Sequence, residues 1–347
     1  MNDDDLALLE STSMHHPYSD TKLLVTPDWD LLKIQLSVLF LLHKLMVSEQ
    51  AIFNLRGKLT LAGRYLQELL QIMPSLIAAV GEYQRLHPTI EAFRQGMEHC
   101  GLVLPLTLLA GTRQNIALLE HFLNEFRTTA NSVKHQRQLR NFQRAANKNL
   151  RGALAYVDGL FERRSRLSVV RLDLSYEKAV AKSITATDTR LHRKRLFKRL
   201  QSHPLFKHCD GYLWKLELGL HKGFHYHACF LFDGSRIRSD ILLARCIGEY
   251  WKQDITGGTG LYFNCNAIQH TYTHSGIGDV HYLDQTKRAA LQKAITYITK
   301  VDTAVRLVLP GNARTFGRGE RFVQLGAKRG RRRQPSTSTI TNAALPA

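Results

Sequence analysis

The chain has 347 residues, 44% of them hydrophobic, so it is long enough for about two domains with packed cores. Residues 1–132 hold 10 basic and 14 acidic side chains, a net charge of −4, whereas residues 133–347 hold 38 basic and 15 acidic ones, a net charge of +23. Such a concentrated positive charge predicts a polyanionic partner, either nucleic acid or an anionic membrane surface.

Membrane insertion and secretion are disfavoured by the sequence. The most apolar runs, residues 34–42 and 101–112, are shorter than the ~20 residues of a spanning helix. The acidic start MNDDDLALLE lacks the positive region of a secretory signal. The five cysteines are dispersed and form no C-x-x-C pair, which is typical of a reducing cytoplasm and disfavours a thiolate zinc finger. Nucleic acid is therefore the favoured partner.

Apolar residues recur at three- and four-residue spacing from Trp29 to about Glu125, which predicts a helical N-terminal region over residues 29–152. The polar residues 1–28 are expected to be a flexible lead-in. The final segment, residues 326–347, is basic and then rich in Ser, Thr and Pro, and we expect disorder there.

Two helices rich in positive charge are predicted, over residues 134–151 and 187–203. Five cations of the first helix fall on one face, and because they repel one another they favour a surface that follows a phosphate backbone. A solvated helix face is the alternative for such a charge run. The candidate DNA-binding residues are Arg137, Arg140, Arg144, Lys148 and Arg151 in the first helix, and Arg193, Lys194, Arg195, Lys198 and Arg199 in the second.

The pattern changes to alternation after residue 165, as expected for strands. Strands are predicted over residues 168–176, 211–220, 224–232 and 261–270, and helices over 187–203, 235–253 and 286–302. This order of elements predicts an α+β fold in which helices pack on a mostly antiparallel sheet.

The stretch HKGFHYHACFLFDG, residues 221–234, places His225 and His227 on one face of a strand. A three-residue hairpin loop ending at Gly223 would set Glu217 directly opposite His227 and diagonal to His225. Two imidazoles and a carboxylate suit a divalent metal with open coordination positions. Imidazoles suit zinc or manganese, while a carboxylate facing a phosphate suits Mg²⁺ or Mn²⁺.

The helix predicted over residues 286–302 places Tyr297 and Lys300 on one face. A tyrosine with an ordinary pKa near ~10 needs help to act as a nucleophile, and a metal or an adjacent cation supplies it. A tyrosine packed on the core beside a surface lysine is the alternative interpretation.

The order Glu217, then His225-Tyr226-His227, then Tyr297-x-x-Lys300 resembles the HUH endonucleases that initiate rolling-circle replication. More narrowly, GFHYHACFLFDG, the W-x-x-E before it, YITKVD and RTFGRG at 314–319 resemble the YagK/YfjJ domain, also called the inovirus Gp2 family, over residues 165–325. That family comprises replication proteins of filamentous phages and related prophage elements.

The resemblance implies an HUH-like central antiparallel sheet flanked by helices. It implies that His225, His227 and Glu217 bind Mg²⁺ or Mn²⁺, and that Tyr297 attacks a DNA phosphate to leave a 5′-phosphotyrosine and a free 3′-hydroxyl. Lys300 would steady the phosphate or the phenolate. The implied substrate is single-stranded or hairpin DNA in a bacterial host cytoplasm, with no small-molecule substrate.

The sequence lacks two features that some rolling-circle initiators have. Lys293 and Val301 stand where a second tyrosine one helical turn away would be, so a single tyrosine is expected and the second strand transfer needs another subunit or a water. No G-x-x-x-x-G-K-[ST] motif is present, so a host helicase and polymerase are the expected partners. A single-tyrosine HUH transposase and a non-catalytic DNA-binding regulator remain alternatives; relaxases place the tyrosine before the histidines.

Overall fold

The computed structural model describes residues 27–102, 113–200, 202–219, 222–272, 275–300 and 305–320. The lead-in and the C-terminal tail that the sequence predicts fall almost entirely outside these residues. Within the described part, no helix combines the length and apolar character that crossing a membrane requires.

The N-terminal region is helical, as predicted. Its helices bury one continuous apolar core that includes Leu42, Leu69, Phe93 and Phe122. The elements of this region are α2 (Pro27–Val47), α3 (Leu61–Ala79), the short strand β1 (Gln84–Leu86), α4 (Pro88–His99) and α5 (Arg113–Asn131).

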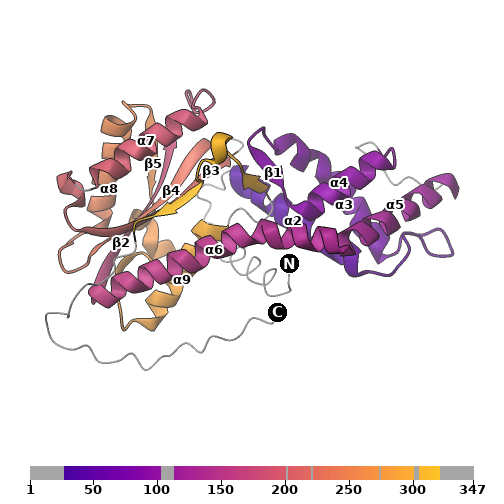
Figure 1. Cartoon of the computed structure of the whole chain (residues 1–347), viewed down its shortest axis with the longest axis horizontal. Helices are drawn as coiled ribbons and strands as arrows, with labels where there is room; N and C mark the ends of the chain where they lie inside the picture. Colours follow the sequence, from indigo (N-terminus) through magenta and orange to yellow (C-terminus); the bar gives the residue numbers. More distant parts are fainter. Residues whose placement is uncertain are drawn as a thin grey trace.

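The long helix α6 (Val133–Arg163) connects the helical region to the sheet and runs along both, as Figure 1 shows. Its start is fixed by Ser132, whose hydroxyl accepts a hydrogen bond from the His135 amide at 3.2 Å. Its first half packs on the helical region, where the His135 ring lies 3.2 Å from the Thr89 hydroxyl. Its second half packs on the sheet through Tyr156 and Leu160.

An antiparallel six-stranded sheet forms the rest of the described chain, confirming the α+β prediction. The strand order is β5-β2-β4-β3-β8, and β6 also pairs with β2. The strands are β2 (Arg166–Tyr176), β3 (Cys209–Gly219), β4 (Gly223–Asp233), β5 (Gly260–Asn264), β6 (Gly278–His281) and β8 (Phe316–Arg318). The helices around them are α7 (Ala186–Arg199), η1 (Pro204–Phe206), α8 (Asp240–Tyr250), η2 (Trp251–Ile255), η3 (Cys265–Thr271), α9 (Gln285–Lys300) and η5 (Pro310–Asn312).

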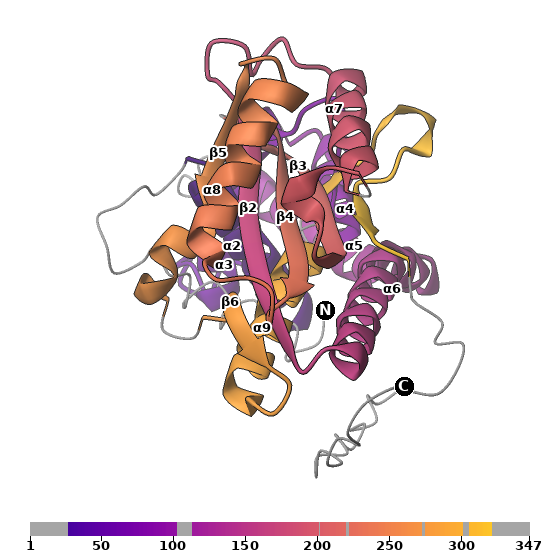
Figure 2. The ribbon, with the colours of Figure 1, turned by 90° about the vertical axis from the view of Figure 1, so that its left-hand side faces the viewer.

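Helices cover the sheet on two sides, because side chains alternate between its faces. Helices α7 and α8 pack on the face that carries Trp214, Tyr226 and Phe230. Helices α6 and α9 pack on the other face, beside Leu213 and Leu231. Figure 1 shows these two pairs of helices on either side of the strands, and Figure 2 shows β2 and β4 side by side in the sheet.

The sequence prediction was wrong in one element. The strand expected over residues 261–270 ends at Asn264, and residues Cys265–Thr271 form the 3₁₀-helix η3. The cause is visible at Asn264, whose side chain accepts the Ala267 amide at 3.2 Å and so begins a turn. The buried Asn266 then fastens this turn to β2 by donating to the Val169 carbonyl at 2.9 Å.

A small second sheet ties the helical region to the hairpin formed by β3 and β4. Strand β1 pairs antiparallel with β7 (Val305–Leu307), which follows α9 in the chain. Beside it, the Gln84 side chain donates to the Leu218 carbonyl at 2.9 Å. The Tyr83 ring lies 6.3 Å from the ring of Phe224. The helical region thus contacts the end of the hairpin that bears the candidate metal ligands.

Candidate metal centre and nucleophile

The register of the β3–β4 hairpin differs from the prediction by two residues. Gly219 pairs with Gly223, and Glu217 lies directly opposite His225 rather than His227. Gly223 has the positive φ of 63° that the prediction assigned to it, but it is already part of the strand pairing. A shift of two residues preserves the face of every side chain, so Glu217 still shares a face with both histidines.

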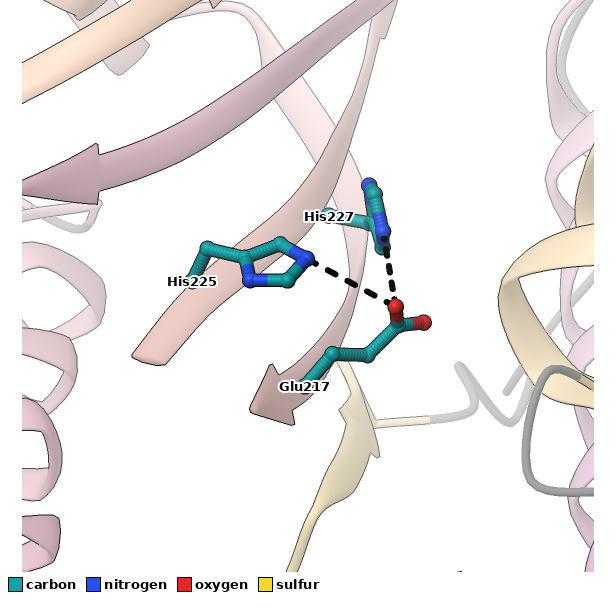
Figure 3. Close-up of side chains that lie close together, drawn as sticks. All are labelled: Glu217, His225 and His227. Atoms are coloured by element: carbon teal, nitrogen blue, oxygen red, sulfur yellow. Dashed lines mark ion pairs between the residues drawn. The ribbon is translucent and has the colours of Figure 1, made fainter. Parts of the chain in front are cut away.

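Each of the two imidazoles is oriented by a hydrogen bond that its own Nδ1–H donates. The His225 Nδ1–H donates to the Gly223 carbonyl at 3.1 Å, and the His227 Nδ1–H donates to the Asp173 carboxylate at 2.6 Å. In each ring the Nε2 lone pair is therefore left for another partner. Figure 3 shows both Nε2 atoms directed at the carboxylate of Glu217.

Glu217, His225 and His227 form a cluster whose ligand atoms all lie within 4.8 Å of one another. Glu217 Oε2 is 3.6 Å from His225 Nε2 and 3.2 Å from His227 Nε2. A divalent ion bound at about 2.1 Å holds its ligand atoms roughly 3 Å apart, so these separations fit one. The other oxygen, Oε1, is buried and has no hydrogen-bond partner in the described chain. The donor set thus fits a divalent cation.

Asp173 is a candidate functional residue that the sequence reasoning missed. It lies on β2 directly opposite His227, and it accepts a hydrogen bond from that ring, as a carboxylate does in carboxylate–histidine–metal sites. Its signal in the sequence was a carboxylate within the alternating strand SVVRLDLSY, on the same face as Arg171. Only the pairing of β2 with β4 brings that carboxylate to the cluster.

The charges of the cluster favour its ionised forms. Burial opposes ionisation of Glu217, but the charge of His227 and the hydrogen bonds of both imidazoles hold the pKa of Glu217 well below its usual range. Burial would lower the pKa of His227, but the carboxylates of Asp173 and Glu217 raise that pKa to about 9. A proton on His227 thus takes the role that a bound cation would have between these acids.

Asp173→Asn is predicted to weaken metal binding without removing a ligand. Asparagine can accept the Nδ1–H bond but carries no charge, so His227 becomes a poorer donor and is held less firmly. We expect the dissociation constant for Mn²⁺ to rise by about 10–100-fold, measured by titration calorimetry. Asp279→Asn, an exposed aspartate on β6, is the control and should leave it unchanged. An unchanged Mn²⁺ affinity in Asp173→Asn would contradict this role.

Tyr297 lies beside the cluster, on α9. Its ring meets the His227 ring edge to face, with centroids 5.9 Å apart and planes at 72°. The Arg171 guanidinium lies over the same tyrosine ring, 5.4 Å from its centroid. The predicted nucleophile and the predicted ligands therefore meet on one face of the sheet. Lys300 ends α9, and its side chain lies outside the described residues.

The two predicted basic surfaces lie on different helices. The five cations of α6 are all exposed, and most of them lie on the first half of that helix, which packs on the helical region. The α7 cations lie on the helix covering the opposite face. Arg193 is half-buried there, with its guanidinium 4.1 Å from the centroid of the Trp214 ring and a hydrogen bond to the Arg314 carbonyl. The sheet therefore separates the α7 cations from the cluster, whereas the α6 cations lie at exposed positions along a helix that runs from the cluster's face of the sheet onto the helical region.

A family model described as the YagK/YfjJ C-terminal domain matches residues 128–319, more than half of the chain. The matched range runs from the end of α5 through β8 and includes the metal cluster, Asp173 and Tyr297. Neither the curated proteins nor the solved structures include a match to this chain.

Proposed function

The chain belongs to the YagK/YfjJ C-terminal domain family, and on that premise we propose that it is an HUH-type rolling-circle replication initiator that nicks and rejoins single-stranded origin DNA. The observation that carries the proposal is the contact between Tyr297 and His227. It sets a phenol against a ligand of a three-residue metal cluster, on a domain with a large positive charge.

Glu217, His225 and His227 would hold Mg²⁺ or Mn²⁺, which polarises the phosphate when bound. The Tyr297 oxygen forms a bond to phosphorus as the bond from phosphorus to the 3′ oxygen breaks. The phenol proton passes to solvent, and the departing 3′ oxygen takes a proton from solvent. The products are a 5′-phosphotyrosine and a free 3′-hydroxyl, so the energy of the phosphodiester is retained for rejoining.

The family match, the cluster and the tyrosine support an enzyme more than a non-catalytic regulator. A non-catalytic DNA-binding regulator would not require a phenol packed against a candidate metal ligand. A single-tyrosine transposase would use the same chemistry and differ in its DNA target.

The direct test incubates the protein with single-stranded DNA of candidate origins and Mn²⁺, and then looks for a covalent protein–DNA adduct on a denaturing gel. Absence of any adduct would overturn the proposal.

The α6 cations are predicted to contribute more to DNA binding than the α7 cations. The triple variant R140Q/R144Q/K148Q removes three exposed charges from α6, whose second half packs on the cluster's face of the sheet, while K194Q/R195Q/K198Q removes three exposed charges from α7, which covers the opposite face. We expect the α6 variant to bind single-stranded DNA about 10–100-fold more weakly and to lower the slope of log affinity against log salt by about 2. Fluorescence anisotropy across a salt series measures both quantities. An equal loss in the two variants would show that DNA contacts both sides.

A further inference from the structure

Arg171 is a second cation at the site that the proposed reaction does not yet use. It lies on β2 two residues before Asp173, so both side chains point to the face of the sheet that bears the cluster. Its backbone is fixed, because its amide donates to the Asn266 side chain at 2.8 Å. Its guanidinium lies over the ring of Tyr297, 5.4 Å from the ring centroid.

The hydrogen-bonding capacity of this guanidinium is not satisfied by the neighbouring acid. Arg171 Nη2 is 3.9 Å from Asp173 Oδ1, which is beyond hydrogen-bond distance, and that oxygen already accepts from His227 at 2.6 Å. Arg171 Nε is buried and has no hydrogen-bond partner in the described part of the chain. Leaving such a donor without an acceptor costs about 1–3 kcal/mol, and more for a charged group.

A purely structural arginine beside an aspartate would be expected to form the paired, two-pronged contact that the two groups favour. Arg171 is instead held near Asp173 but not bonded to it, and against the ring of the proposed nucleophile. Its side chain also keeps 18% of its surface exposed, so part of it remains within reach of a ligand. The missing acceptor is therefore expected beside Tyr297.

We propose that Arg171 binds the phosphate that Tyr297 attacks, an inference that rests on the proposed function. A phosphodiester carries one negative charge, and more charge gathers on its non-bridging oxygens as the tyrosine oxygen adds. The planar guanidinium matches those oxygens with two parallel N–H donors. Removing one such donor from a site of this kind slows reactions by about 10²–10³-fold.

The test compares two substrates that differ only in the charge of the reacting phosphate. Single-stranded DNA carries either the natural phosphodiester or a neutral methylphosphonate at the cleaved position, and adduct formation is followed under single-turnover conditions with saturating Mn²⁺. Arg171→Gln is expected to slow the reaction of the phosphodiester about 10²-fold. On the methylphosphonate the same variant should react within about threefold of wild type, because that substrate lacks the charged non-bridging oxygen that Arg171 is proposed to bind. Arg166→Gln, on the same strand and paired with Asp279, is the control and should match wild type on both.

The possible outcomes separate this proposal from others. Equal slowing on both substrates would show that Arg171 only positions Tyr297 or Asp173, and a wild-type rate in Arg171→Gln would show that it does neither; each overturns the proposal. Should Arg171→Gln fail to fold, Arg171→Lys can replace it in the test, because lysine keeps the positive charge but lacks the two parallel N–H donors. Its adduct formation is expected to be about 10-fold slower than wild type on the phosphodiester only. An absence of adduct from the wild-type protein with either substrate would instead refute the proposed function, and the role of Arg171 with it.

Discussion

Replacing Tyr297 with phenylalanine is expected to abolish covalent capture of single-stranded DNA. The phenylalanine ring keeps the edge contact with His227 and the contact with Arg171, so the fold and the cluster should be preserved. Only the attacking oxygen is lost, and the rate of adduct formation should fall by roughly 10⁴-fold or more. The measurement is a denaturing gel of labelled oligonucleotide, with DNA affinity and Mn²⁺ affinity determined in parallel and expected to stay within about twofold of wild type.

Tyr262→Phe is the matched control. That tyrosine lies on β5, and its hydroxyl donates to Glu249 on the outside of the domain at 2.8 Å. It should form adduct at the wild-type rate. If Tyr297→Phe formed adduct as fast as wild type, another residue would be the nucleophile.

Glu217→Gln is expected to remove divalent-metal binding while leaving metal-independent DNA binding largely intact. The amide has the shape of the carboxylate but no charge, and its nitrogen cannot be a ligand. We expect the dissociation constant for Mn²⁺ to rise more than about 100-fold. A readout independent of catalysis is the melting temperature, because a ligand that binds only the folded state adds about 2.7 kcal/mol at 100 times its dissociation constant. Wild type should show this stabilisation on addition of Mn²⁺, and Glu217→Gln should not.

Glu162→Gln, an exposed glutamate on α6, provides the control for the loss of a negative charge. It should keep the stabilisation by Mn²⁺. A parallel loss of DNA binding and of metal-dependent cleavage in Glu217→Gln would mean that Glu217 maintains the hairpin rather than the metal.

The ligand set could be predicted from sequence because it requires only that the three residues point to the same face of the hairpin. It does not require the exact pairing of the two strands. Glu217, His225 and His227 are separated by even numbers of positions across a short loop, so any two-residue shift of the hairpin returns them to one face. The pairing of the two strands was mispredicted by two residues for this reason: a glycine with positive φ ends a loop or begins a strand equally well, and Gly223 does the latter. The error changed which histidine faces Glu217 and left the set intact.

Asp173 and Arg171 could not be assigned because their partners are distant in sequence. The alternation in residues 168–176 shows that the two side chains share a face, but it does not reveal that β2 lies next to β4. The sequence likewise does not show which face of the sheet each helix covers. The charge of α7 is as evident in the sequence as that of α6, and only the packing of Leu196 among the residues of the far face places it away from the cluster.

The pairing of β1 with β7 sets a practical limit on how the protein can be divided. The family match begins at residue 128, which suggests a cut before α6. Such a fragment would lose Gln84 and Tyr83, exposing the edge of β7, the Leu218 carbonyl and the Phe224 ring at the positions that adjoin Glu217 and His225. An expression plasmid designed on the matched range alone should therefore yield a less soluble, poorly metallated product, and one that begins upstream of β1 and α2 is the better starting point for crystallisation.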